Sequence, residues 1–92
     1  MRTLREAAAL VLEDGHELTA DAYLHKNISG SWWGTLTFPA EAKTPALLNL
    51  AEGRLRFGDR EAAFIRTNTS DWLDSPAGHF RILVEGSGDA PF

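Results

Sequence analysis

Residues 30–38, Gly-Ser-Trp-Trp-Gly-Thr-Leu-Thr-Phe, contain two of the three tryptophans and alternate between apolar and polar side chains. Alternate residues of a β-strand point to the same face, so this pattern predicts a strand with one buried side. Four residues share the predicted core face: Trp32, Gly34, Leu36 and Phe38. Trp33 then lies on an outer face that otherwise carries threonines. Gly34 would leave a gap where the strand bends or another side chain crosses it. We predict that this segment is the central strand.

Two turn signals predict hairpins on either side of this strand. Asp14-Gly15 separates residues 9–13 from 16–24, and Gly58-Asp59 separates residues 54–57 from 61–67. Residues 79–85 alternate in the same way and are predicted to form a last strand.

The first arm of the first hairpin has an alternative interpretation. Thr3 and Glu6 have the spacing of a helix capping box, and Leu4, Ala8 and Val11 would share one helical face. The Asp-Gly turn favours a strand, but the pattern leaves residues 4–13 open between strand and helix.

A short helix is predicted between the third and fourth strands. Thr44 is suited to the N-cap and Pro45 to the first helical position, and Gly53 would end the helix. Six short strands in 92 residues close into a barrel more easily than they stack as two sheets. The predicted fold is therefore all-β, a small partly open β-barrel of about six strands over residues 1–85, with a flexible tail at 86–92.

Composition excludes several classes of function. The chain has no cysteine, so disulfides, thiolate metal sites and cysteine nucleophiles are absent. The first residues lack the apolar segment of a secretory signal, and no run approaches the ~20 apolar residues of a membrane span. We expect a soluble cytoplasmic protein without membrane contact. The net charge of −4 argues against nucleic acid as the partner.

No pattern predicts catalysis, a metal site or a cofactor. His16, His25 and His79 are far apart in sequence, and the serines lack a nucleophile motif such as G-x-S-x-G. Asp71 and Asp74 flank Trp72-Leu73 and are expected to cap turns. We expect a non-enzymatic protein.

Five arginines are expected to form a stripe on the outside of the second hairpin and the last strand: Arg54, Arg56, Arg60, Arg66 and Arg81. Arginines on exposed strand positions commonly pair with acids across the ladder. An anionic partner is the alternative, because RNA-binding barrels stack bases on aromatic residues beside such a stripe.

The tryptophans outside the predicted core suggest an interaction module. Trp33 and Trp72 could form an exposed patch that binds a protein partner or a second copy of the chain, or the loop at 68–78 could fold over Trp33 as a second small core. An exposed strand edge is another route to association. The candidate interaction surface comprises Trp33, Trp72, Leu73, Arg54, Arg56 and Arg66. Two alternatives remain: a small ligand at a barrel mouth lined by Trp32 or Trp33, Tyr23 and His25, and nucleic acid on the arginine hairpin.

Overall fold

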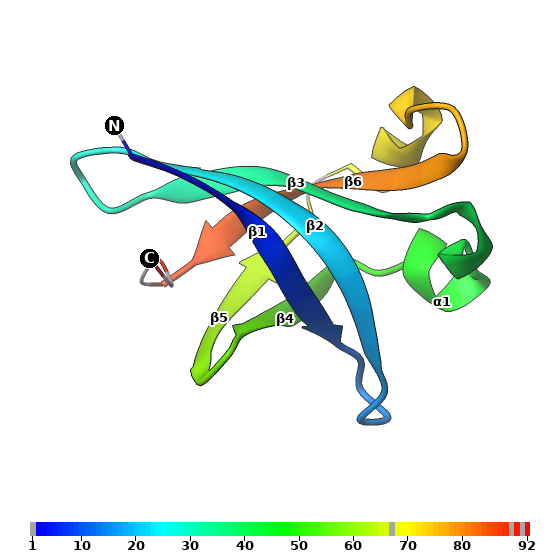
Figure 1. Ribbon diagram of the computed structural model, residues 1–92, viewed down its shortest axis with the longest axis horizontal. Coiled ribbons are helices and arrows are strands. Elements are labelled where there is room, and N and C mark those ends of the chain that lie inside the picture. Colours follow the sequence, from blue (N-terminus) through cyan, green and yellow to red (C-terminus); the bar gives the residue numbers. More distant parts are fainter. Residues whose placement is uncertain (1, 67, 89, 91) are drawn as a thin grey trace.

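A computed structural model of the chain describes residues 2–66, 68–88, 90 and 92. Its antiparallel strands form a closed barrel in the order β1-β2-β3-β6-β5-β4 (Figure 1). The strands are β1 (Arg2–Val11), β2 (Glu17–Lys26), β3 (Trp32–Pro39), β4 (Glu52–Phe57), β5 (Arg60–Ile65) and β6 (His79–Ser87). The helical elements are α1 (Pro45–Leu48) and the 3-10 helices η1 (Ala40–Ala42) and η2 (Asp71–Asp74). The predicted barrel with a short helix between the third and fourth strands is confirmed.

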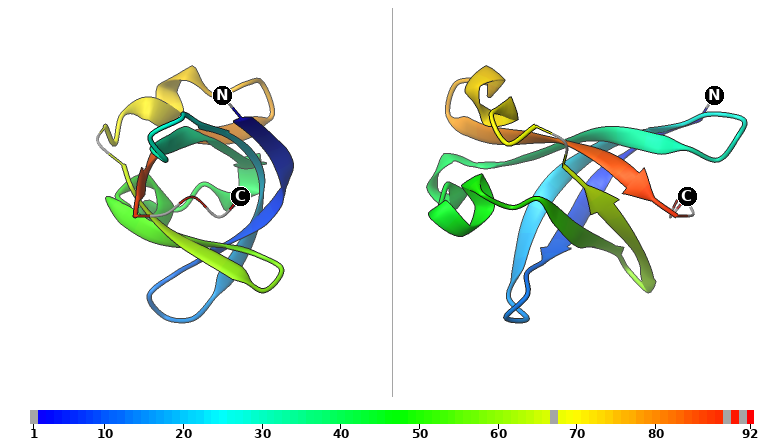
Figure 2. Two further views of the ribbon diagram at one scale, coloured as in Figure 1. Left: turned by 90° about the vertical axis from the view of Figure 1, so that its left-hand side faces the viewer. Right: turned by 180° about the vertical axis from the view of Figure 1, so that it is seen from behind.

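The barrel is closed where the sequence predicted a partly open one. Ala9, Leu10 and Val11 of β1 pair with Arg56, Leu55 and Arg54 of β4. Figure 2 shows the strands curving around a common axis, with the β1–β2 and β4–β5 hairpins diverging below it. Closure therefore depends on a short ladder between the two hairpins.

Period-two alternation sets the core. All four residues predicted on the inner face of β3 are buried: Trp32, Gly34, Leu36 and Phe38. The inner positions of the other strands join them, among them Leu10, Leu24, Leu55, Phe64, Phe80 and Ile82. Burying aliphatic and aromatic side chains at these positions contributes about 25 cal/mol per Å² of apolar surface, which drives barrel formation.

Residues 2–11 are a strand rather than a helix. Each residue of β1 from Arg2 to Val11 pairs with β2, down to Glu17 beside the turn. Gly15 has φ +89°, which a glycine adopts without steric cost. The backbone N–H of His16 donates to the Asp14 carboxylate at 2.9 Å, and the His16 ring Nδ1 lies 2.6 Å from it; these bonds hold the pKa of Asp14 below its usual value.

Two glycines allow close approaches inside the sheet. A Cβ on Gly34 would lie 2.1 Å from the Tyr23 carbonyl oxygen, so the gap predicted at Gly34 is filled by the β2 backbone and Leu24. A Cβ on Gly86 would lie 2.0 Å from Trp32 Nε1, so glycine is required where the indole crosses β6.

The C-terminal residues do not begin a tail at 86. β6 continues through Gly86 and Ser87, and partly buried Ala90 and Phe92 pack against the core. Lys26 Nζ donates to the Phe92 carbonyl oxygen at 2.5 Å and lies 5.4 Å from the centre of its ring. The described part of the predicted tail is thus in contact with the barrel.

The helix α1 begins as predicted and is shorter than predicted. Thr44 Oγ1 accepts a hydrogen bond from the Leu47 N–H at 3.3 Å, and Pro45 occupies the first position. Leu47 is buried in the core, which fixes the helix against the barrel. The helix ends at Leu48, and the chain enters β4 at Glu52.

Arg66 and Asp71 form a buried ion pair. Arg66 Nε lies 2.9 Å from Asp71 Oδ2, Arg66 Nη2 lies 2.5 Å from Oδ1, and both side chains are fully buried. Arg66 Nη1 donates to three backbone carbonyls at 2.8–3.1 Å, those of Leu47, Leu48 and Leu50. The predictions of Arg66 on the outer surface and of Asp71 as a turn cap are therefore wrong, because each satisfies the other's charge inside the fold.

Replacing Asp71 with alanine should leave the Arg66 guanidinium buried without its counter-charge. We expect Asp71→Ala to lower the free energy of unfolding by about 3–5 kcal/mol, measured by urea denaturation. The control is Arg54→Ala, which removes a solvent-exposed pair whose Nη2–Oε2 distance to Glu61 is 4.0 Å. It should cost less than about 1 kcal/mol. Similar small losses in both variants would contradict a central role for the buried pair.

Candidate interaction surface

Three ring side chains lie in a row on the outer face of β2 and β3, each tilted against the next. Tyr23 and His25 have ring centres 4.8 Å apart, and His25 and Trp33, which are opposite each other in the ladder, have ring centres 5.7 Å apart. The guanidinium of Arg5 lies 5.7 Å from the centre of the Tyr23 ring, and Thr3 Oγ1 lies 3.3 Å from His25 Nδ1. β1 therefore supports one side of this row with polar contacts.

Aliphatic side chains extend the row over the neighbouring strands. Leu83 of β6 lies opposite Thr35 of β3, and Ile65 of β5 lies opposite Glu85 of β6, which in turn is opposite Trp33. We call Tyr23, His25, Trp33, Leu83 and Ile65 the platform. Four of its members are large hydrophobic residues between 38% and 51% exposed. Such a gathering on the outside of a small barrel is typical of a binding surface.

A hollow of about 340 Å³ adjoins the platform beside Tyr23. Its walls combine Tyr23, Thr35 and Pro76 with charged groups of both signs: Arg5, Asp21 and Arg81. The platform thus has an apolar centre and a polar, hollowed border.

Trp72 lies apart from Trp33. η2 lies at the other end of the barrel from the β2–β3 turn (Figures 1 and 2), whereas Trp33 is the second residue of β3 after that turn. Trp72 is half-buried against the core, and Lys43 Nζ lies 4.3 Å from the centre of its ring. Leu73, beside it, is 68% exposed. The two tryptophans therefore form neither a shared patch nor a shared second core.

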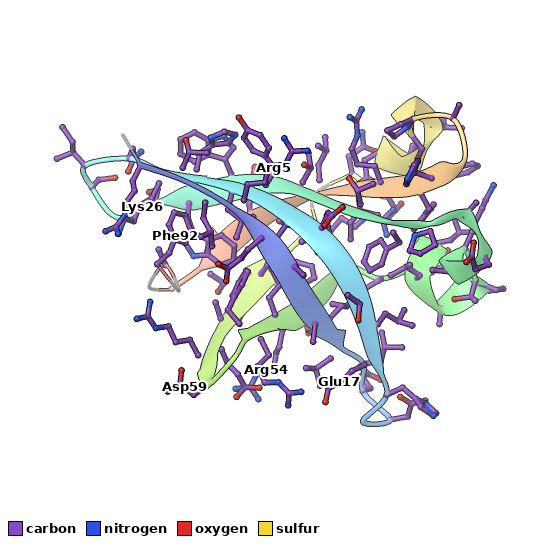
Figure 3. The ribbon with its side chains drawn as sticks, viewed as in Figure 1. Arg5, Glu17, Lys26, Arg54, Asp59 and Phe92 are labelled. Atoms are coloured by element: carbon purple, nitrogen blue, oxygen red, sulfur yellow. The ribbon has the colours of Figure 1, made fainter. Side chains whose placement is uncertain are left out.

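The arginines of the β4–β5 hairpin lie away from the platform. In Figure 3, Arg54 and Asp59 lie at the lower side of the barrel and Arg5 lies at the upper side. Arg54 pairs with Glu61, and Arg56 pairs closely with Glu17 on β2. These pairs follow the expectation that exposed strand arginines contact acids across the sheet.

The ionisable side chains do not converge on a metal site. Among the described residues, no three histidine or acidic side chains lie close enough to hold a metal ion. His16 contacts Asp14, His25 belongs to the platform, and His79 Nδ1 lies 3.0 Å from the Ala77 carbonyl oxygen. None of the helices in the described ranges has the length and apolar character to cross a membrane.

No known family model, curated protein or solved structure matches this chain. The function of the candidate surface is therefore inferred from the positions, exposure and charges of its own residues.

Sequence reasoning found part of this surface. It identified Trp33 as an outward aromatic, and it assigned Tyr23 and His25 to a barrel mouth, whereas they lie on the outer wall and Trp32 is buried in the core. It missed Leu83 and Ile65. Their signal is present in the sequence, because each is an apolar residue at an outward position of an alternating strand.

The two tryptophans should respond differently to truncation. Trp33→Ala removes an exposed ring and should cost less than about 1 kcal/mol of unfolding free energy. Trp72→Ala removes a half-buried ring and should cost about 2 kcal/mol or more. Urea unfolding followed by circular dichroism measures both. An equal loss for Trp33→Ala would indicate that its ring serves stability rather than binding.

Proposed function

We propose that this protein is a non-enzymatic interaction module that binds a protein partner through the platform. The observation that supports this best is the row of contacting rings of Tyr23, His25 and Trp33 on the outside of a barrel whose inner positions form an apolar cluster. Tyrosine and tryptophan contribute strongly to protein interfaces, because they bury large apolar areas with few rotatable bonds.

The charges within the platform define the partner's surface. Glu85 lies between Trp33 and Ile65 in the ladder, so a partner that covers the platform also covers its carboxylate. An unpaired buried carboxylate is costly, and the partner must therefore place a lysine, an arginine or hydrogen-bond donors there. At the hollowed border beside Tyr23, the positive charge of Arg5 favours an acidic group on the partner. The complementary partner has an apolar centre, a cation near Glu85 and an acid near Arg5.

The alternative functions have less support. The residues suggested for a small-ligand site lie on the outer wall, and the hairpin arginines Arg54 and Arg56 have acidic partners. Arg66, the third arginine of the candidate surface, is buried. These placements weaken the case for a ligand in the barrel mouth and for nucleic acid on the hairpin.

Site-specific photo-cross-linking tests the proposal. A benzoylphenylalanine at position 35, between Tyr23 and Leu83 in the ladder, should capture a partner from an extract of the producing cells. The same group at position 28 is the control, because Ile28 is fully exposed and lies outside the platform. We expect a protein captured from position 35 alone, and we expect Trp33→Ala to reduce its capture about tenfold or more.

Leu73→Ala provides a matched variant, since it removes an exposed apolar side chain elsewhere on the barrel. Capture should be unchanged in this variant. If positions 35 and 28 recover the same proteins, or if Trp33→Ala and Leu73→Ala behave alike, the platform is not the binding surface.

A further inference from the structure

The N-terminal half of β1 extends past its neighbour. β4 turns into β5 at Gly58-Asp59, and its ladder with β1 covers Ala9–Val11. Among the residues that the structure describes, positions 2–8 of β1 therefore have β2 on one side and no strand on the other. Within the described parts of the chain, no backbone hydrogen bond from outside the strand ladders reaches residues 2–8. Their outer edge thus carries backbone donors and acceptors suited to another strand.

β6 also extends past its neighbour β5, but side chains cover its unpaired edge. β6 pairs with β5 through Glu85–Ser87, and the preceding edge is covered by η2 and the residue after it. Asp71 Oδ2 accepts a hydrogen bond from the Leu83 N–H at 2.7 Å, and Ser75 Oγ accepts one from the Arg81 N–H at 2.9 Å. Side chains thus occupy the edge of β6, whereas that of β1 is available for pairing.

Symmetry limits how this edge can pair with a second copy of itself. Two identical antiparallel strands related by a twofold axis place one residue opposite its own copy. Because the axis keeps inner side chains with inner ones, residues opposite each other are both even or both odd in number. Registers centred on Arg5 or Glu6 place like charges directly opposite, which is destabilising. Within the described part of β1, a register centred on Thr3 joins only residues 2–4.

The register centred on Leu4 places no like charges opposite each other and gives a longer ladder than the register centred on Thr3. It pairs residues 2–6 of the two copies, with Leu4 opposite Leu4 of the second copy. Arg2 lies opposite Glu6 of the second copy, and symmetry repeats this opposite-charge pair. Leu4 is half-buried and packs against the core from the inner face, so its contact with its copy covers apolar surface.

We propose that the protein forms a twofold-symmetric dimer by antiparallel pairing of residues 2–6 of β1, in the register centred on Leu4. The pairing makes the strands β3-β2-β1 of one copy continuous with β1-β2-β3 of the other. The platforms of the two copies then lie on the same side of this sheet, which gives a partner two equivalent binding surfaces. This dimer uses a different surface from the platform and does not depend on the proposed function.

Charge reversal tests the register directly. Sedimentation equilibrium of the wild type over a range of concentrations should show a monomer–dimer equilibrium. Glu6→Arg and Arg2→Glu each place like charges opposite each other twice, and each should raise the dissociation constant about tenfold or more. The double variant Arg2→Glu/Glu6→Arg restores opposite charges and should return the constant to near the wild-type value. Both side chains are exposed, and circular dichroism verifies that each variant is folded.

The proposal would be overturned by a wild type that stays monomeric at millimolar concentration, by a dimer unaffected by Glu6→Arg, or by a double variant no tighter than the single ones. Trp33→Ala is the control for the other surface and should leave the dimer intact. Loss of the dimer in Trp33→Ala would place self-association on the platform instead. Amide hydrogen exchange of the wild type needs no variant: those N–H groups of residues 2–6 that point away from β2 should become more protected as concentration rises.

Discussion

The buried ion pair of Arg66 and Asp71 connects segments that the strand ladders leave apart. Arg66 satisfies the carbonyls at the end of α1, and Asp71 accepts the N–H of Leu83 on β6. Both the last turn of a helix and the edge of a strand expose unsatisfied backbone groups, which are costly to bury. One pair of opposite charges satisfies both sets, and its own desolvation cost is offset by those added hydrogen bonds.

The position of Asp71 against β6 also affects which parts of the barrel surface are accessible for binding. Because Asp71 holds η2 against β6, the edge of that strand is occupied, and the Leu83 side chain is left facing outwards in the platform. Among the described residues, the unpaired strand edge lies instead on β1, beside Arg5 and the rings of the platform. The proposed partner surface and the proposed dimer edge are therefore neighbours on one sheet.

Much of the fold follows from local patterns. Alternation identified the inner face of β3, the Asp-Gly turn identified the first hairpin, and the Thr44-Pro45 pair identified the start of α1. Gly86 was assigned to a tail because its requirement is not local: it makes room for Trp32, a residue more than fifty positions earlier. The candidate surface was predicted in part through Trp33, but Arg66 has the same local pattern as an exposed strand-end arginine.

The sequence by itself determined which side chains point inwards and which point outwards, because a strand's period of two is a property of the local backbone. It also determined the charge sequence of β1, from Arg2 to Glu6. The tertiary structure alone decided which outward residues are neighbours, because adjacency across β2, β3, β6 and β5 follows from strand order and register. It also decided that Arg66 is inside, since a charge is buried only where the fold supplies a counter-charge and acceptors, here the Asp71 carboxylate in η2 and the carbonyls at the end of α1.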